Sequence, residues 1–274
     1  MKIISVLSFL FFCANSISGR AAAVDTVEVV AQKMMKPVKS VILQPTVREQ
    51  DKSYPVLYLL HGAFGKYDDW VKKVPELQQW VDHYEIIVVC PDGGYNSWYF
   101  NSTRDDNFQY ESYIMEDLLP WVEEHFPVKR NRKGRAISGL SMGGHGAFYL
   151  ATGYPEIFGA VGAMSGGLDF RPFPDNWNIK DRIGNFNDHP AAWNERVAVN
   201  RVERLKPGQM AIAFDCGTGD FFYEVNLQLH KKLEQLEIPH QFTVRPGGHD
   251  WAYWSNSLEY HMVFFHRFFS GSTE

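Results

Sequence analysis

The sequence predicts an α/β fold in which a mostly parallel sheet carries helices on both faces. Short runs of β-branched residues recur along the 274-residue chain. They are almost continuously apolar, as strands buried on both faces must be. Segments with the apolar spacing of helices separate several of these runs. Strands and helices that alternate in this way form right-handed βαβ crossovers and a parallel sheet. The hydrophobic fraction of 45% is ample for the core of one large domain.

The first two runs have no helix between them, and the later runs end at loops that contain glycine. Residues 27–30 and 38–43 should therefore pair antiparallel at an edge of the sheet. The other predicted strands are Val56–Leu60, Ile86–Cys90, Arg135–Ser138, Ala160–Met164, Ala211–Asp215 and Gln241–Arg245. Helical spacing is clearest in residues 113–125 and 225–236. Ligands of such sheets bind at the carboxyl ends of the strands, so the loops there should hold the chemistry.

The N-terminus has the pattern of a signal peptide. Lys2 precedes an apolar run from Ile3 to Cys13, which is too short to span a bilayer. Small residues follow, and two alanines stand in the A-x-A spacing of a cleavage site. Cleavage is expected after Ala23 or, alternatively, a few residues earlier near Ser18.

The processed chain should be an exported single domain, periplasmic or secreted. Residues 1–23 are the expected signal peptide and residues 24–274 the expected domain, with no later segment apolar enough to span a membrane. Removing residues 1–23 takes away two positive charges and no acid, so the formal net charge of −5 becomes −7. This balance excludes the global basic surface of a nucleic-acid binder. The one basic run, residues 129–135, is expected to be a solvated turn.

Cys90 and Cys216 are the two cysteines left after the signal peptide, and each lies at or just past the end of a different predicted strand. In an oxidising compartment they could form one disulfide, or they could be two small buried hydrophobic residues. Neither belongs to a C-x-x-C pair, and nothing in the sequence indicates a metal or an organic cofactor.

The segment Gly139-Leu140-Ser141-Met142-Gly143 joins a predicted strand to a predicted helix. The pattern G-x-S-x-G is weak on its own, but a strand before it and a helix after it are the context that a nucleophilic serine needs. Such a serine sits in a strained turn that holds its oxygen clear of the backbone. Glycine two residues before and after it avoids collisions with the neighbouring elements. Ser141 is therefore the candidate nucleophile.

His249 is the histidine best placed to activate that serine, because it lies in the loop that follows the last predicted strand. Three aspartates compete to stand behind it. Asp215, at the end of its strand, is alternatively a turn carboxylate that accepts backbone N–H bonds. Asp250 directly follows His249, so its side chain is poorly placed to reach back to Nδ1. Asp220 has enough loop to do so and gives the chain order Ser, Asp, His, which favours it as the acid.

The oxyanion of a tetrahedral intermediate needs two backbone N–H donors. One is expected from Met142, at the N-terminus of a helix, where free N–H groups point outward. The other should come from the loop after His61 and Gly62, with Ala63 as the candidate and Phe64 as its neighbour. His61 itself is expected to be structural.

Several short segments occur in a characteristic order along the chain: Tyr58-Leu59-Leu60-His61-Gly62, Pro91-Asp92-Gly93, Gly139-Leu140-Ser141-Met142-Gly143-Gly144, Cys216-Gly217-Thr218 with Asp220, and Gly247-Gly248-His249-Asp250. Together they resemble the esterase D family of α/β-hydrolases, which includes feruloyl and acetyl-xylan esterases, tributyrin-type esterases, S-formylglutathione hydrolases and mycolyltransferases. The resemblance covers nearly all of the chain after the signal peptide. It implies the α/β-hydrolase fold and places the family's nucleophile, acid and base on Ser141, Asp220 and His249. Its oxyanion donors fall on Met142 and Ala63; many relatives carry Leu at the latter, a difference that a backbone donor tolerates.

Aromatic residues cluster on the loops that should surround the serine. Trp98 and Tyr99, on the loop after the fourth predicted strand, and Trp251 and Trp254, near the C-terminus, are the candidates for substrate contact. Residues 165–202 carry further aromatic residues and should form an irregular insertion with a short helix over the pocket. Aromatic platforms suit sugar rings and phenolic acyl groups. Core packing is the alternative for any one of them.

These features predict an exported serine carboxylesterase that works through an acyl-enzyme. Export and the loop aromatics favour acylated carbohydrate, with acetyl or feruloyl esters on a small molecule or a polysaccharide. The alternatives are an acyltransferase with a sugar acceptor and an S-formylglutathione hydrolase-like thioesterase; the signal peptide disfavours the second, because glutathione metabolism is mainly intracellular. A non-catalytic carbohydrate-binding relative is disfavoured by the intact set of candidate residues. The sequence leaves the oligomeric state open.

Overall fold

The eight predicted strands form one sheet in the computed structural model, which describes residues 22–272. Their order across the sheet is β1-β2-β4-β3-β5-β6-β7-β8. The strands are β1 (Ala23–Ala31), β2 (Lys36–Gln44), β3 (Val56–Leu60), β4 (Ile87–Pro91), β5 (Arg135–Gly139), β6 (Ala160–Met164), β7 (Ala211–Gly217) and β8 (Gln241–Arg245). β1 pairs antiparallel with β2, and β2 with β4, while the other pairs are parallel. The predicted fold class and the predicted antiparallel pair at the edge are therefore confirmed.

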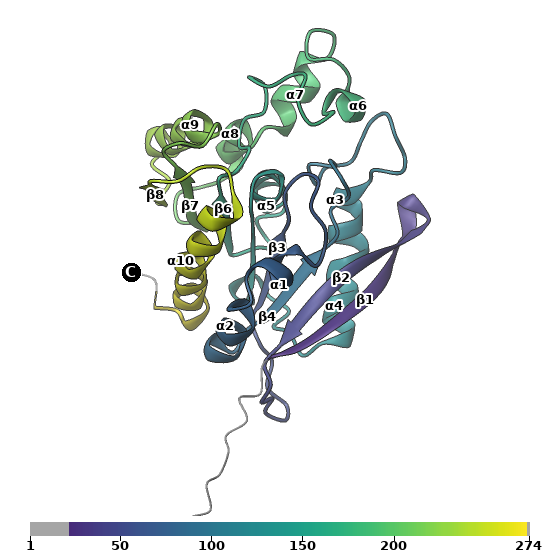
Figure 1. The fold of residues 1–274 in the computed structure, drawn as a ribbon, viewed down its shortest axis with the longest axis vertical. Helices are drawn as coiled ribbons and strands as arrows, with labels where there is room; N and C mark the ends of the chain where they lie inside the picture. The colour runs from purple at the N-terminus through teal and green to yellow at the C-terminus, as the bar shows by residue number, and fades with distance from the viewer. Residues whose placement is uncertain (1–21, 273–274) are drawn as a thin grey trace, which may run out of the picture.

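Helices cover both faces of the sheet, and a small group of them stands beyond one of its ends (Figure 1). One face carries α3 (Tyr110–Ser112), α4 (Leu119–His125), α5 (Met142–Gly153), α8 (Ala198–Arg201) and α9 (Tyr223–Gln235). The other face carries α1 (Asp69–Lys73), α2 (Leu77–Tyr84) and α10 (Trp251–Ser270). The outlying group is α6 (Lys180–Ile183) and α7 (Pro190–Arg196), at the top of the view. Single turns complete the chain: η1 (Gln32–Met34), η2 (Tyr113–Leu118), η3 (Arg132–Gly134) and η4 (Val202–Arg204).

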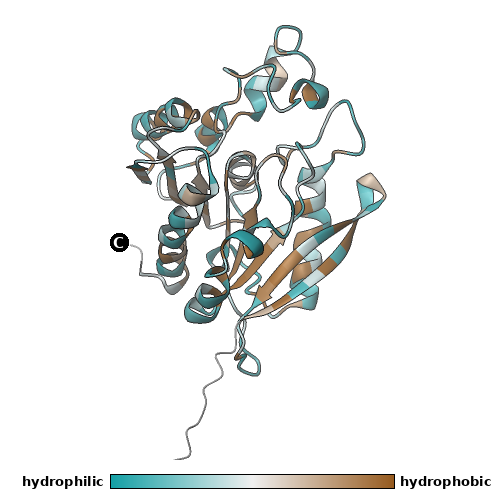
Figure 2. Cartoon of the chain, in the orientation of Figure 1, coloured by the Kyte–Doolittle hydropathy of each residue, from teal (hydrophilic) through white to brown (hydrophobic). Residues whose placement is uncertain are grey.

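The central strands are buried on both faces, as their continuous apolar sequences require. All five residues of β3 are buried, with Leu57 and Leu59 in one apolar cluster and Val56, Tyr58 and Leu60 in the other. Figure 2 shows these strands as the most hydrophobic part of the molecule, with hydrophilic residues on the outer sides of the helices. β8 differs, because it lies at the edge of the sheet and is largely exposed. The expectation that it is buried on both faces was wrong.

The helices depart from the predicted ranges in ways that local chemistry explains. The predicted helix over 113–125 begins at Tyr110, passes through the π-helical turn η2 and continues as α4. Pro120 lacks the N–H that an α-helical bond to the preceding turn would need, which favours the change of helix type. The helix α10 was not predicted. It begins after Asp250, whose side chain accepts the Tyr253 N–H, and ends at Gly271, whose φ is 72°.

Two smaller expectations are settled by the same packing. Cys90 and Cys216 are buried and free, and they lie in the apolar clusters on opposite faces of the sheet, so they do not form a disulfide. The expectation that the basic run 129–135 is a solvated turn was wrong in part. Lys133 is exposed, but Arg135 starts β5, is buried, and pairs with Glu123 of α4.

The predicted signal peptide lies almost wholly outside the described residues, which begin at Ala22. Ala22 is buried, and Ala23 opens β1 opposite Gln44 of β2. Within residues 22–272, no helix is both long and apolar enough to cross a membrane.

Candidate active site

Ser141 occupies a strained turn between β5 and α5. Its φ of 53° and ψ of −119° lie in a region that side-chain-bearing residues rarely adopt. The flanking glycines are what permit this turn. A Cβ on Gly143 would lie 2.5 Å from the Leu60 carbonyl oxygen, and one on Gly139 would lie 2.5 Å from the backbone of Gly143. The Ser141 N–H donates to the Met164 carbonyl at 3.0 Å, which fixes the turn to β6.

His249 lies between Ser141 and Asp220 and is within hydrogen-bond distance of both. Its Nε2 is 2.9 Å from Ser141 Oγ, and its Nδ1 is 2.9 Å from Asp220 Oδ2 and 3.1 Å from Oδ1. Asp220 is buried and is oriented by the Phe222 N–H, which donates to Oδ1 at 2.8 Å. An ionised carboxylate only accepts, so Nδ1 carries the proton and donates it to Asp220. The lone pair of Nε2 is then directed at the serine hydroxyl.

The two competing aspartates lie elsewhere. Asp250 caps α10. Asp215 is buried, and its Oδ2 accepts from His261 Nε2 at 2.9 Å and from the Ser257 hydroxyl, with Arg245 Nη2 at 3.2 Å. Burial would raise the pKa of Asp215, but the hydrogen bond from His261 and its other partners hold that pKa below the ordinary value. These partners are side chains, so the expectation that Asp215 accepts turn N–H groups was wrong.

Two backbone N–H groups near Ser141 remain the candidates for an oxyanion hole. Met142 is the first residue of α5, where helix N–H groups have no partner within the helix. Ala63 lies in the loop after β3 and lines the same cavity as Ser141. Its neighbour Phe64 is already engaged, because its N–H donates to the Tyr95 carbonyl at 2.8 Å. That engagement favours Ala63 as the second donor. His61 has a structural position, since its Nε2 accepts the Gly93 N–H at 2.8 Å.

A cavity of about 200 Å³ opens on Ser141 and His249. Its aromatic lining consists of Phe64, Trp177, Phe221, Trp251 and Trp254, and its charged lining consists of Asp69 and Lys73. The Phe221 ring stacks on Trp177, with centroids 6.0 Å apart and planes at 26°, and lies 4.3 Å from the His249 ring. Two of the four candidate substrate residues, Trp251 and Trp254, are thus at the cavity.

Trp98 and Tyr99 do not line this cavity, so the expectation that they contact the substrate was wrong. Both are almost fully buried, and their φ values of 57° and 59° turn the chain inward. The Tyr99 ring fills the space that side chains at Gly93 and Gly146 would occupy, and its hydroxyl donates to the His61 carbonyl at 3.1 Å. Trp98 packs behind the cavity, with its ring 5.6 Å from that of Trp177.

Phe64 and Phe221 were not predicted as cavity residues. The available signal for Phe221 was its position next to the candidate acid, and for Phe64 its position next to the candidate oxyanion donor. Trp177 belongs to the aromatic stretch 165–202 that was expected over the pocket. That stretch holds α6, α7, α8 and the start of η4, more helix than the single short one expected.

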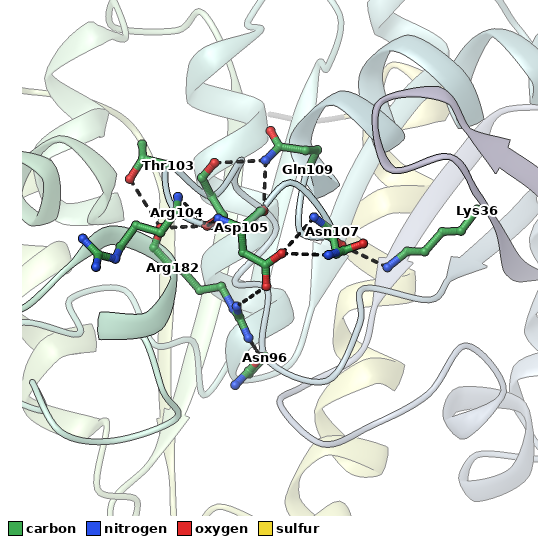
Figure 3. A network of polar contacts seen from close by, with 9 residues as sticks. Lys36, Asn96, Thr103, Arg104, Asp105, Asn107, Gln109 and Arg182 are labelled. Carbon is green, nitrogen blue, oxygen red and sulfur yellow. Dashed lines mark hydrogen bonds and ion pairs between the residues drawn. The ribbon is translucent and has the colours of Figure 1, made fainter.

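A polar network ties this insertion to the segment after β4 (Figure 3). The Arg182 guanidinium donates to Asp105 Oδ2 at 3.2 Å and to Asn96 Oδ1 at 3.1 Å, and it lies 3.4 Å from the centroid of the Phe108 ring. The Arg182 carbonyl accepts from the Ser102 hydroxyl at 2.9 Å. Both the side chain and the backbone of Arg182 therefore tie the insertion that carries Trp177 to the segment after β4.

The described residues contain no group of three His, Cys, Asp or Glu side chains that could hold a metal ion. What the site does contain is a serine, an imidazole and a carboxylate linked by hydrogen bonds in that order, beside a cavity. Together with the sheet, this arrangement is that of a serine hydrolase of the α/β-hydrolase class.

A family model described as "Putative esterase" matches residues 31–265. The chain belongs to this esterase family, and it is a carboxylic ester hydrolase. The predicted resemblance to acetyl esterases, ferulic acid esterases and S-formylglutathione hydrolases is confirmed at the level of the family.

Three relatives illustrate the similarity. An acetyl esterase of Caldicellulosiruptor saccharolyticus is 26% identical over 249 residues, which are 82% of this chain and 92% of the relative. Esterase Rv1288 of Mycobacterium tuberculosis is 30% identical over 238 residues, which are 78% of this chain and 52% of the relative, so the chain spans about half of that protein. The solved structure of a ferulic acid esterase is 28% identical, covers 91% of this chain and 99% of its own, and has a TM-score of 0.79.

Proposed function

We propose that this esterase hydrolyses short-chain or aromatic acyl esters of carbohydrate, outside the cytoplasm, with Ser141 as nucleophile, His249 as base and Asp220 as acid. The observation that carries the proposal is the position of His249, hydrogen-bonded to Asp220 on one side and to a serine in a strained turn on the other.

The reaction follows from these contacts. Ser141 Oγ attacks the ester carbonyl carbon while its proton passes to His249 Nε2, and Asp220 stabilises the imidazolium that forms. The N–H groups of Met142 and Ala63 stabilise the negative oxygen of the tetrahedral intermediate. When the intermediate collapses, the C–O bond to the alcohol breaks and the alcohol takes the proton from His249. Water then attacks the acyl-enzyme, again giving its proton to His249, and the acid leaves as Ser141 recovers that proton.

The cavity supports a small acyl group. A cavity of about 150 Å³ in a protein core holds one benzene molecule, so about 200 Å³ suits an acetyl group or a single ring with a short linker. A long aliphatic chain would extend into water. The aromatic walls formed by Trp177, Phe221 and Trp254 favour a flat ring. The similarity to an acetyl esterase and to a ferulic acid esterase supports the same two acyl groups.

The test is a substrate panel of p-nitrophenyl acetate, butyrate and decanoate, methyl ferulate and acetylated xylan, assayed in the presence of EDTA. We expect the two short esters to be cleaved and the decanoate to be much the poorest, with release of acetate from xylan or ferulate from the methyl ester. Cleavage of the decanoate alone would contradict the proposal. Product analysis with added sugar acceptors separates hydrolysis from acyl transfer, since a transferase would form acylated sugar.

Export is proposed from residues 1–23 and is tested separately. Expression of the full chain in a bacterial host should release a protein whose N-terminus, read by mass spectrometry, begins at residue 24 or a few residues earlier. An intact N-terminus in the cytoplasmic fraction would overturn this part of the proposal.

A further inference from the structure

The cavity beside Ser141 contains an ion pair with no place in the reaction described above. Asp69 and Lys73, one turn apart on α1, both line the cavity. Lys73 Nζ is 3.6 Å from Asp69 Oδ1, which is beyond hydrogen-bond distance. The other oxygen, Asp69 Oδ2, accepts the Lys66 N–H at 3.0 Å. Lys73 is the one lysine or arginine among the residues that line this cavity, and within residues 22–272 its ammonium has a carboxylate partner in Asp69 alone, at a distance too long for a hydrogen bond.

The ammonium of Lys73 lies over an aromatic wall of the cavity, on a side chain that is 44% exposed. Lys73 Nζ lies 4.6 Å from the centroid of the Trp251 ring, which also lines the cavity. Trp251 meets the buried Trp70 ring edge-on at 5.2 Å, and Trp70 Nε1 donates to the Leu60 carbonyl at 3.1 Å. The ammonium of Lys73 thus lies over the Trp251 ring, which packs against Trp70, and Trp70 is anchored to β3.

We infer that Lys73 selects esters that carry a carboxylate on the group that occupies this cavity. This inference rests on the proposed function and names a substrate class for it: an ester of an acidic sugar, or a half-ester of a dicarboxylic acid. An ammonium has donors only, and its strongest partners are anionic oxygens. A substrate that fills the aromatic cavity displaces water, which strengthens the contact between the two charges.

Lys72 provides a matched control on the same helix. It pairs with Asp68 at 2.5 Å in the same i,i+4 arrangement, but it does not line the cavity. Lys72→Met and Lys73→Met therefore change the net charge by the same amount, and only the second removes an ammonium from the cavity. Lys73→Arg keeps the charge there.

The experiment measures kcat/KM for two pairs of esters that differ in one carboxylate. On the acyl side, p-nitrophenyl hemisuccinate is compared with p-nitrophenyl butyrate. On the alcohol side, p-acetoxybenzoate is compared with p-acetoxybenzamide. In at least one pair, Lys73→Met should lower the ratio of anionic to neutral ester by roughly tenfold, the size expected for one hydrogen bond to a charged group. Lys72→Met should leave both ratios within about twofold, Lys73→Arg should keep most of the preference, and added salt should weaken it in the wild type.

The pair that responds shows which side of the ester carries the carboxylate. If Lys73→Met leaves both ratios unchanged, or if Lys72→Met lowers them equally, the inference is wrong. The neutral esters keep this separate from the proposed function: wild-type enzyme that cleaves none of them contradicts the proposed function, whereas neutral cleavage without any dependence on Lys73 contradicts only the inference.

Discussion

The molecule contains two hydrogen-bonded Asp-His-Ser triplets, one with its aspartate in the loop that follows β7 and one with its aspartate near the end of β7 itself. A cavity opens on the serine of one triplet but not on the serine of the other. In the first, Asp220, His249 and Ser141 are joined by contacts of 2.9 Å and 2.9 Å. In the second, Asp215 and His261 are 2.9 Å apart, and His261 Nδ1 is 3.4 Å from Ser138 Oγ. The residue types and the Asp–His distances are therefore the same in the two, and the His–Ser distance is longer in the second.

The difference lies in the backbone and in access. Ser138 is inside the central strand β5 and is fully buried, whereas Ser141 stands three residues later in a turn with φ of 53° and lines a cavity. A second cavity, of about 510 Å³ beside β8, reaches Asp215 and His261 but not Ser138. A hydrogen-bonded triplet becomes reactive only where the turn presents the serine to a substrate. The buried triplet instead joins β5, β7 and α10, which begins directly after the loop of His249.

Substitution of the two serines should give the largest difference between the two triplets. Ser141→Ala should lower kcat for p-nitrophenyl acetate by several powers of ten, on the order of 10⁴ to 10⁶, because it removes the nucleophile. Ser138→Ala, the matched control, should change kcat by less than about threefold, since its loss removes one buried hydrogen bond. Comparable losses in both variants would mean that the buried triplet takes part in the reaction.

The two aspartates extend the comparison to the acid. Asp220→Asn should lower kcat on the order of 10⁴-fold, because an amide no longer holds His249 in the tautomer that accepts the serine proton. Its melting temperature should change little. Steady-state kinetics and thermal unfolding of the same preparation measure both quantities, and nearly full activity would exclude Asp220 as the acid.

Asp215→Asn should show the opposite behaviour. Removing a buried carboxylate that is paired with His261 and Arg245 should lower the free energy of unfolding by about 3 kcal/mol. At temperatures where the variant is folded, its kcat should stay within about threefold of wild type. Denaturant unfolding measures the stability change, and a stable but inactive variant would contradict the structural role of Asp215.

A third histidine, His145, is buried outside both triplets and should make the stability of the fold depend on pH. His145 is fully buried, and burial lowers its pKa from 6.5 to about 4. Between these two values the unfolded chain binds more protons than the folded one, so lowering the pH from 6.5 to 4 should cost stability, by up to about 3 kcal/mol. Above pH 6.5 this contribution is fully present. Denaturant unfolding at pH 7 and pH 4.5 measures it; His145→Asn should flatten the difference, and equal wild-type stability at both values would exclude the effect.

The sequence was sufficient to predict the parts of the molecule that depend on local pattern. The central strands are continuous apolar runs, and Ser141 lies in a glycine-flanked turn whose neighbours leave no room for a Cβ. Asp220 and His249 follow from chain order and loop length. The signals for the strands and for Ser141 lie within a few residues of the features that they predict, whereas those for Asp220 and His249 also use their order relative to Ser141.

The lining of the cavity could not be predicted in this way, because it depends on which way loop side chains point. Trp98 and Tyr99 face the core only because two successive residues adopt positive φ and because distant glycines, Gly93 and Gly146, leave room for the Tyr99 ring. Phe221 reaches the cavity by stacking on Trp177, which lies 44 residues earlier in the chain. Such contacts are set by tertiary packing and leave no local pattern.

The most direct test of the central claim, that access and backbone geometry make Ser141 the nucleophile, is covalent labelling. The protein is treated with a fluorophosphonate and the modified residue is mapped by mass spectrometry. One label on Ser141, with Ser138 and Ser257 unmodified and no label on Ser141→Ala, is the result that the structure predicts. Labelling of a different serine, or stoichiometric labelling of Ser141→Ala, would contradict it.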